Sequence, residues 1–556
     1  MENRFEQIIS RLLTNKTLVI LGALLVPLVV IKFVSKDTNV DPLLIYFLLS
    51  AGLFVGFYVF NLSLKFSYLP YLLLQLIIIW IFLDNKISEI LGINIKLYAL
   101  VFGLSFVVSI FYFFRHFKYL WDNYVAFRLL LIFFFINIFY FLFYHSDFRS
   151  WYSDYMDIWL ARPEVRLFFI REGMDVFAKS FSETQYVGMY LSSLVPVISF
   201  IVAVMSFKDT ISLNKLTEKL FLIARIVIFT IAGYFFLSLL FIAIGISTIG
   251  FVDGRLWGDF LGFGHAFAIY LSYYVLFLAG LKVILNYFNK NQNMEIENNL
   301  INLLIIISLS LIVLQINKTA LVALAFALAV LLCGLLISHV KFNFFSIKES
   351  ETSTNKASTK ILAYVSVLIV MLLIFLFYFE HLTEAFSTTS SRIIQRFTTF
   401  STFNIRTILW EYFLEYWYEN LNLFRLFFGF GIDASREASF RISQIIAGDI
   451  RLFTSPLVHV HNLYFEMFYD YGLMALFYFG SIFYIAFDNI KNIISKKKNQ
   501  AVKLFSIISL SIITFFAVFS TTEILRIPIA IVFFSLLGFF EVLKYNFLKF
   551  KNQLLL

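Results

Sequence analysis

The polar segment 380–461 carries the side chains best suited to chemistry. It contains seven arginines and no lysine, whereas most of the other connecting loops prefer lysine. The arginines are Arg392, Arg396, Arg406, Arg425, Arg436, Arg441 and Arg451. A planar guanidinium binds two phosphate oxygens at once, whereas an ammonium group is only a point charge, so this bias favours recognition of an oxyanion such as a diphosphate. His461, where the segment meets the next hydrophobic run, is a candidate general base, and the combination predicts group transfer from a lipid-linked donor.

Long apolar runs dominate the rest of the chain. Of its 556 residues, 61% are hydrophobic and 14% are charged. Runs of about 18 to 25 apolar residues, separated by short polar links, are typical of a polytopic helical membrane protein. We therefore predict an all-α fold with about 14 transmembrane helices and with cytoplasmic N- and C-termini. The single cysteine, Cys333, lies within an apolar run and excludes an intrachain disulfide.

The predicted spans divide the chain into three parts. The first part, 1–246, contains the N-terminal helices and an outer loop at 146–186. The second part, 247–487, is the predicted catalytic core and contains the long loop 380–461. The third part, 488–556, contains the C-terminal helices and a basic tail. The spans lie near 17–34, 43–62, 66–83, 97–114, 125–145, 187–206, 219–246, 263–286, 299–316, 319–338, 361–379, 462–487, 503–522 and 525–547.

Lysine and arginine collect in every second loop. With the N-terminus inside, all of these clusters fall on the inner face, as the positive-inside rule requires. They are Arg4, Arg11 and Lys16; Arg115 and Lys118; Lys208, Lys215 and Lys219; Lys341, Lys348, Lys356 and Lys360; Lys491 and Lys496 to Lys498; and Lys544, Lys549 and Lys551 in the tail. The net charge of +9 therefore lies mostly beside anionic membrane lipid, and we expect no nucleic-acid partner.

The loop 380–461 breaks this charge rule with its seven arginines, and its length predicts a functional, partly helical structure on the outer face. Residues 405–420 have the pattern of an amphipathic helix that lies on the membrane with its aromatic stripe facing the lipid. The stripe consists of Ile408, Leu409, Phe413, Trp417 and Tyr418. Gly429-Phe430-Gly431 then predicts a tight backbone turn.

Three outer segments resemble motifs of one known family. They are Arg255-Leu-Trp-Gly258-Asp-Phe260 leading into a helix near His265, Arg406-Thr-Ile-Leu-Trp410 followed by Gly429-Phe430-Gly431, and His461-Asn462-Leu-Tyr464-Phe-Glu466. In this order and on this face they resemble the bacterial O-antigen ligase and Wzy-type polysaccharide polymerase superfamily, integral-membrane glycosyltransferases of the GT-C type. The resemblance covers roughly 247–487 and departs at Asn317-Lys318, where the family often has Ser-Arg.

The resemblance implies an inverting glycosyl transfer that needs no metal or other cofactor. The donor is a glycan on undecaprenyl diphosphate, and the acceptor is a sugar hydroxyl of a glycan or glycolipid at the periplasmic face of the bacterial inner membrane. Arg255 and Arg406 are expected to hold the departing diphosphate. Arg392 and Arg396, four residues apart, are further candidates, and Lys318 keeps a positive charge without the bidentate geometry.

His461 is then expected to take the proton from the attacking hydroxyl. Supporting or acceptor contacts are assigned to Asn462, Trp410, Glu466 and His265. Structural alternatives stay open for each: Arg255 as a snorkelling helix anchor, Arg406 as an ion-pair partner of Glu411 or of lipid, and His461 as a helix cap. His459 is interpreted as structural.

Two classes of function compete. We favour an enzyme, and among enzymes a Wzy-type polymerase, because the chain has about 14 predicted spans; its acceptor is another lipid-linked repeat unit, and it can have a chain-length regulator as partner. The alternative is an O-antigen ligase, whose acceptor is lipid A–core. The other class is a flippase for lipid-linked oligosaccharide. Transporters place ionisable groups near the membrane centre and often contain internal repeats. Here the charged residues avoid the centres of the predicted spans, with Arg225 as an exception, and the two halves of the sequence show no repeat. Peptidoglycan glycan polymerases are a further possibility within the enzyme class, but the His461-Asn462 motif resembles them less.

Overall fold

The computed structural model describes the chain in separate stretches. They are residues 68–75, 97–144, 194–208, 249–252, 255–258, 264–288, 295–314, 318–338, 401–432, 434–446, 460–495 and 498–522 and 527–553, with the isolated positions 218–219, 222–223 and 226. Nearly all of these residues are helical. The helices are α4 (Leu69–Gln75), α6 (Leu97–Asn123), α7 (Val125–Phe143), α11 (Leu194–Phe207), α13 (Gly264–Phe288), α14 (Glu295–Leu314), α15 (Lys318–Ile337), α18 (Ser401–Asn420), α19 (Leu423–Phe428), α20 (Ala434–Ile446), α21 (Leu463–Tyr471), α22 (Ala475–Ile494), α23 (Gln500–Phe519) and α24 (Ile527–Gln553).

Five helical segments in the described part are long and apolar enough to cross a membrane. They are Val125–Phe143, Thr319–Ile337, Leu463–Ile494, Gln500–Phe519 and Ile529–Leu548. The prediction of a multi-pass helical membrane protein is confirmed. The predicted number of spans stays a prediction, because the predicted spans 17–34, 43–62 and 361–379, and most of 219–246, lie outside the described residues.

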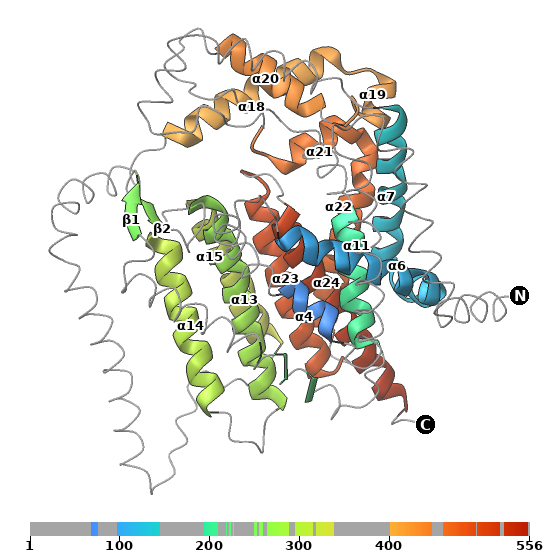
Figure 1. Ribbon diagram of the computed structural model, residues 1–556, viewed down its shortest axis with the longest axis vertical. Helices are drawn as coiled ribbons and strands as arrows, with labels where there is room; N and C mark the ends of the chain where they lie inside the picture. Colours follow the sequence, from blue (N-terminus) through green and yellow to red (C-terminus); the bar gives the residue numbers. More distant parts are fainter. Residues whose placement is uncertain are drawn as a thin grey trace, which may run out of the picture.

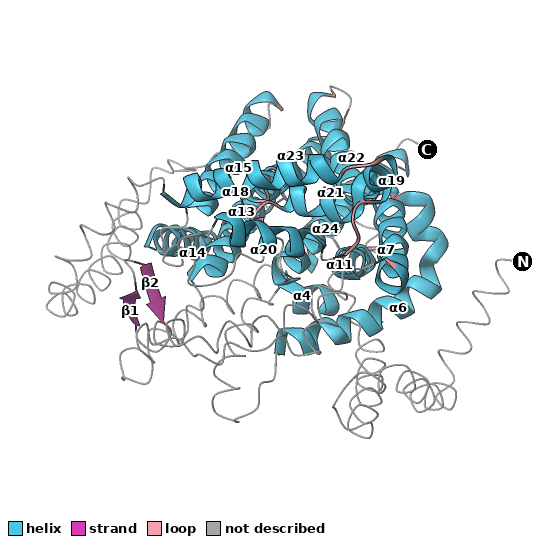
Figure 2. Cartoon of the chain, turned by 90° about the horizontal axis from the view of Figure 1, so that it is seen from above, coloured by secondary structure: helices cyan, strands magenta, loops and turns pink. Residues whose placement is uncertain are grey.

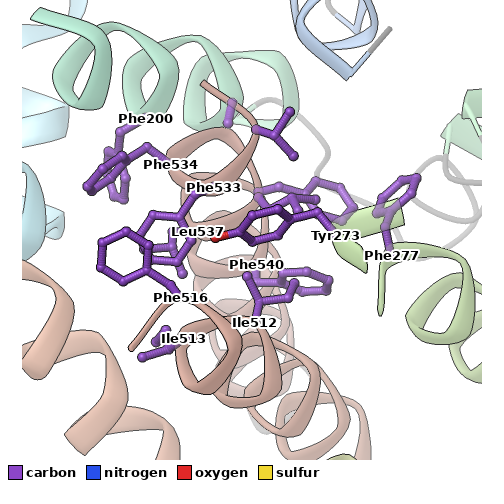
Figure 3. Close-up of a cluster of buried hydrophobic side chains, with 14 of the residues drawn as sticks. Phe200, Tyr273, Phe277, Ile512, Ile513, Phe516, Phe533, Phe534, Leu537 and Phe540 are labelled. Carbon is purple, nitrogen blue, oxygen red and sulfur yellow. The ribbon is translucent and has the colours of Figure 1, made fainter. Parts of the chain in front are cut away.

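One hydrophobic core joins helices from all three predicted parts of the chain. Helix α11 packs along α24, α15 packs along α23, and α22 packs between α7 and α23 (Figures 1 and 2). Phe516 of α23 stacks on Phe533 of α24 with ring centroids 4.1 Å apart, and Tyr273 of α13 and Phe200 of α11 lie beside them (Figure 3). This aromatic packing makes the bundle a rigid support for the residues at its ends.

The structure corrects the prediction that Lys544 belongs to the basic tail. Helix α24 continues to Gln553, and Lys544 is buried within it. Its ammonium group pairs with Glu541 of the same helix and with Asp488 of α22 at 3.1 Å, and it donates to the Asn489 Oδ1 at 2.6 Å. Two carboxylates and an amide oxygen replace the water that a buried ammonium group loses. Lys544 therefore ties α24 to α22 instead of facing the cytoplasm.

Part of the long loop forms a cap on one end of the bundle. We use the name cap for residues 401–446 without position 433, which contain α18, α19 and α20, and cap end for the end of the bundle that they cover (Figure 1). The cap meets the end of α7, where the Ile432 amide donates to the Tyr144 carbonyl at 3.3 Å. The prediction of a partly helical loop is confirmed, with α18 beginning at Ser401, one turn earlier than predicted.

The predicted membrane-facing stripe of α18 is wrong. Leu409 and Phe413 are fully buried against α20 and α21, where they form a small second core with Ile442 and Tyr469. Tyr418, assigned to the same stripe, is 81% exposed. The apolar face of α18 is covered by protein, because α20 and α21 bring apolar faces of their own to it.

A short β-hairpin was not predicted. Strands β1 (Ile249–Val252) and β2 (Arg255–Gly258) pair antiparallel, with Val252 opposite Arg255. In the sequence, Asp253-Gly254 lies between Val252 and Arg255. An Asp-Gly pair between two short apolar segments is a common hairpin signal, so the hairpin could have been predicted from it. The hairpin contacts α13 and α14.

The outer position of the cap is testable by cysteine labelling. In a Cys333→Ala background, we expect Glu419→Cys in α18 to react with a membrane-impermeant maleimide in intact spheroplasts, because the lysine-free loop is predicted to be outside. Lys491→Cys, which is also exposed and lies at the far end of α22, is expected to react only after permeabilisation. The reverse labelling pattern would invert the topology.

Candidate active site at the cap end

His461 has an unusual backbone conformation. Its φ is 54°, and it is the one residue other than glycine with a positive φ in the described part of the chain. A left-handed conformation costs a non-glycine residue about 1–3 kcal/mol and persists only where the surrounding structure enforces it. Such strain is concentrated at functional sites, so the backbone itself singles out the histidine that the motif identified.

Both neighbours of His461 are anchored. On one side, the fully buried Val460 accepts a hydrogen bond through its carbonyl from the Trp410 indole at 2.8 Å. On the other side, the Asn462 side chain caps α21 by accepting from the Phe465 amide at 3.1 Å, and the Leu463 amide donates to the Ser520 carbonyl at 2.9 Å. Helices α18, α21 and α23 therefore hold the backbone of His461 in place.

The ends of three membrane helices meet at this point. The Thr522 hydroxyl, just beyond α23, donates to the Thr319 hydroxyl at the start of α15 at 3.1 Å. The Tyr464 hydroxyl in the first turn of α21 donates to the Ala517 carbonyl near the end of α23 at 3.0 Å. Helices α15 and α21 thus begin on either side of the end of α23. Their N-termini carry partial positive charge, which favours an anion at the cap end.

Arg406 is brought toward His461 by α18. It is partly buried and lies four residues before Trp410, so the two side chains share one face of the helix. The indole of Trp410 contacts the backbone next to His461 and packs edge-to-face against Phe465, with ring centroids 6.0 Å apart. The predicted pair Arg406 and Trp410 therefore belongs to the same corner of the molecule as the predicted base.

The structure describes the backbone positions of some of the remaining predicted site residues and not of others. Lys318 is the first residue of α15, and Glu466 lies in the first turn of α21. Arg255 is the first residue of β2. His265 lies in the first turn of α13, as predicted. The structure does not describe the side chains of Arg255, His265 or Lys318. Arg392, Arg396 and His459 lie outside the described residues.

Sequence reasoning missed the junction at the end of α21. The amides of Phe430 and Gly431 donate to the carbonyls of Tyr469 and Asp470 at 2.9 and 3.0 Å. The Asp470 carboxylate accepts from the amide and the hydroxyl of Ser435 at 2.7 and 3.1 Å, in the first turn of α20. Asp470, at the end of α21, thus accepts a hydrogen bond from a backbone amide that has no partner within α20, and its negative charge lies at the positive end of that helix.

Two glycines allow this junction to form. Gly429 has a φ of 72°, which confirms the predicted turn, and Gly472 has a φ of 56°. A β-carbon on Gly472 would lie 2.5 Å from the Gly429 amide nitrogen and 2.5 Å from the Leu426 carbonyl oxygen. A β-carbon on Gly429 would overlap the backbone of Asp470. The two chain segments therefore cross at a distance that any side chain would prevent.

Helix α7 supplies three further contacts that sequence reasoning missed. The Tyr140 and Tyr144 hydroxyls donate to the carbonyls of Phe428 and Gly429 at 2.6 and 2.9 Å. The Asn137 amide donates to the Tyr471 hydroxyl at 2.7 Å. The spacing of these three residues places them on one face of a helix that is otherwise rich in phenylalanine. That polar face is the signal that identifies them in retrospect.

Two of the seven arginines serve the structure of the cap itself. The Arg425 guanidinium lies 4.6 Å above the Phe430 ring and donates to the Asn420 carbonyl at 2.7 Å. Arg441 pairs with Glu437 on the same helix at 2.5 Å. The interpretation of the whole arginine set as oxyanion ligands is therefore too broad.

The comparison with family models identifies residues 303–480 as similar to the family described as O-Antigen ligase, a match over 178 of the 556 residues. The matched segment includes Lys318, Arg406, Trp410 and His461, and it confirms the resemblance that the motifs indicate. A membrane enzyme resembling glycosyltransferases, which handles glycans in O-antigen biosynthesis, agrees with this match and with the apolar helices. A search of curated proteins found no match.

The glycine crossing predicts a strong effect on stability. Gly472→Ala is expected to lower the free energy of unfolding by more than about 1 kcal/mol, because the added carbon meets rigid backbone in a left-handed conformation. Gly103→Ala in α6 is the control, since its β-carbon meets nothing within 4 Å, and it should be neutral or stabilising by up to ~1 kcal/mol. Thermal unfolding in lipid nanodiscs measures both, and equal behaviour of the two variants would contradict the crossing.

Proposed function

We propose that this protein transfers a glycan from undecaprenyl diphosphate to a sugar hydroxyl at the periplasmic face of the inner membrane, as a Wzy-type polymerase. The observation that carries the proposal is the strained backbone of His461, which is anchored on both sides. The energetic cost of that conformation has a reason if the imidazole must be presented at one position.

His461 acts as the general base in this scheme. The acceptor hydroxyl attacks the anomeric carbon on the side opposite the diphosphate, so a new carbon–oxygen bond forms as the bond to the diphosphate oxygen breaks. The hydroxyl proton goes to the imidazole, and the electron pair of the broken bond leaves with the diphosphate. Inversion at carbon follows from this single displacement. General-base catalysis by a positioned histidine contributes about 10²–10⁴-fold.

Fixed positive charge offsets the charge of the leaving diphosphate. Arg406 lies at the corner occupied by His461, and the N-termini of α15 and α21 add their partial charges. Lys318 stands at the first of these N-termini, and we propose Arg255, the first residue of β2, as a further contact to the diphosphate. Cationic groups of this kind perform the role that a divalent metal has in many soluble transferases, so we propose a reaction that is independent of metal.

The acceptor decides between two versions of this function. A polymerase extends one lipid-linked repeat unit with another, under the control of a chain-length regulator, and the number of predicted spans favours it. A ligase transfers the finished glycan to lipid A–core, and the description of the matched family favours this alternative. The flippase alternative has no comparable support, because the matched segment contains the predicted base and the predicted donor arginine together.

A glycine substitution separates the chemistry of His461 from its effect on folding. His461→Gly is expected to be as stable as the parent or more stable, because glycine adopts the left-handed backbone without strain. Its turnover should fall by about 10²–10⁴-fold while the affinity for the lipid-linked donor is retained. The measurements are thermal unfolding, donor binding and product formation on purified protein in nanodiscs.

Two further variants complete this test. His461→Ala should lose the same activity without gaining stability, and His459→Ala should keep most of its turnover. If His461→Gly retained turnover within about threefold of the parent, a base would be excluded and a structural role for His461 would be favoured.

Incubation with one substrate distinguishes polymerase from ligase. Lipid-linked repeat units alone should give a ladder of longer products if the protein polymerises, and no ladder if it requires lipid A–core. In the productive assay, Arg406→Lys should be nearly as inactive as Arg406→Ala, since lysine keeps the charge but loses the bidentate contact. Arg441→Lys is the control, because Arg441 pairs within α20 and its replacement should leave turnover unchanged. Full activity of Arg406→Lys would remove Arg406 from the donor site.

A further inference from the structure

Helix α19 has an inverted distribution of polar and apolar side chains. Five of its six residues are apolar, and none of the six is buried. Leu423 is 74% and Phe424 is 57% exposed, whereas the single charged residue, Arg425, is less exposed than any of its helical neighbours. A helix in water shows the opposite arrangement, with the charge outside and the apolar groups inside.

The inward position of Arg425 is specific. Its guanidinium stacks on Phe430, which itself stacks on Tyr469 with centroids 4.2 Å apart, and it donates to the Asn420 carbonyl. The helix is also capped, since the Asn422 side chain accepts from the Arg425 amide at 2.8 Å. Polar groups of the first turn are therefore satisfied within the protein, and the surface left outside is almost entirely hydrocarbon.

Helix α7 indicates the medium at this surface. Its 19 residues rise about 28 Å, close to the ~30 Å of a bilayer core, so its last turn lies at one boundary of the hydrocarbon. Tyr140 in that last turn donates to the carbonyl of Phe428 at the end of α19. Helix α19 therefore lies level with the end of a membrane span, beside which Figure 1 also shows it.

The exposed surface of α19 continues that of α7. Phe139 and Phe143, on the last turns of α7, are exposed in the same way, and Tyr144 contacts Phe424 with ring centroids 5.9 Å apart. Tyrosines such as Tyr140 and Tyr144, at the end of α7, are enriched where a bilayer meets water. We propose that α19 is inserted among the acyl chains of the leaflet on the cap side and holds the cap at a fixed depth in the membrane.

Spin labelling tests this insertion directly. In a Cys333→Ala background, a nitroxide at Phe427→Cys in α19 is compared with one at Phe139→Cys on α7 and one at Glu411→Cys on the exposed face of α18. In phosphatidylglycerol–phosphatidylethanolamine vesicles, the Phe427 label should match the Phe139 label, with greater relaxation by oxygen than by a water-soluble nickel chelate. The Glu411 label should show the opposite preference.

Two outcomes would overturn the proposal. Nickel accessibility at Phe427 equal to that at Glu411 would place α19 in water, and protection from both reagents would place it against protein, such as a second copy of the chain. Neither outcome depends on the reaction proposed for His461.

Hydrogen exchange provides a second measurement. Leu423→Gln combined with Phe427→Gln should accelerate exchange of the Phe430 and Gly431 amides about tenfold in bilayers, because their bonds to α21 depend on the position of α19. Thr407→Gln, exposed on α18, should leave this exchange unchanged. Equal exchange in the double variant and the control would contradict an anchoring role.

Discussion

The crossing of two backbone segments at Gly429 and Gly472 is the contact on which the cap end depends. At this point the turn after α19 lies directly on the end of α21, and hydrogen bonds from Phe430 and Gly431 join them. No side chain fits between the segments, so their separation cannot vary as it does at an ordinary side-chain contact. The carboxylate of Asp470 then orients α20 from the same point.

The crossing and the candidate base lie at opposite ends of one short helix. Helix α21 has nine residues, with Asn462 and His461 before its first turn and Gly472 after its last. The cap contacts both ends, through Trp410 near the start and through Gly429 near the finish. A rigid helix held at each end by the same cap gives the imidazole a defined position relative to Arg406.

Two charged side chains in the described part of the chain hold helices together, the partly buried Arg425 and the buried Lys544. Arg425 connects the cap to the aromatic stack on α21, and Lys544 connects α24 to α22 at the other end of α22. In a membrane, apolar surfaces gain little by leaving lipid for protein, so hydrogen bonds and close packing carry more of the association between helices. The tyrosine and asparagine contacts of α7 follow the same principle.

Much of the architecture is local and could therefore be predicted from the sequence. Hydropathy identified the membrane helices, the glycine pair identified the turn at Gly429, and the residue order identified His461-Asn462 as the start of α21. Each depends on a few neighbouring residues, whose conformational and hydration preferences act in isolation. The motif at 255–260 and the arginines at 392 and 396 remain predictions about side chains that the structure does not describe.

The tertiary structure decided which partner each face meets. The periodicity of α18 showed an apolar stripe but not that Leu409 and Phe413 pack on α20 and α21, because lipid and protein interior are equally apolar to a helix. Sequence likewise could not separate Arg425, which stacks on Phe430, from Arg406, which lies four residues before Trp410 on α18. The left-handed backbone of His461 is likewise imposed from outside, by contacts with α18 and α23 that lie far away in the chain.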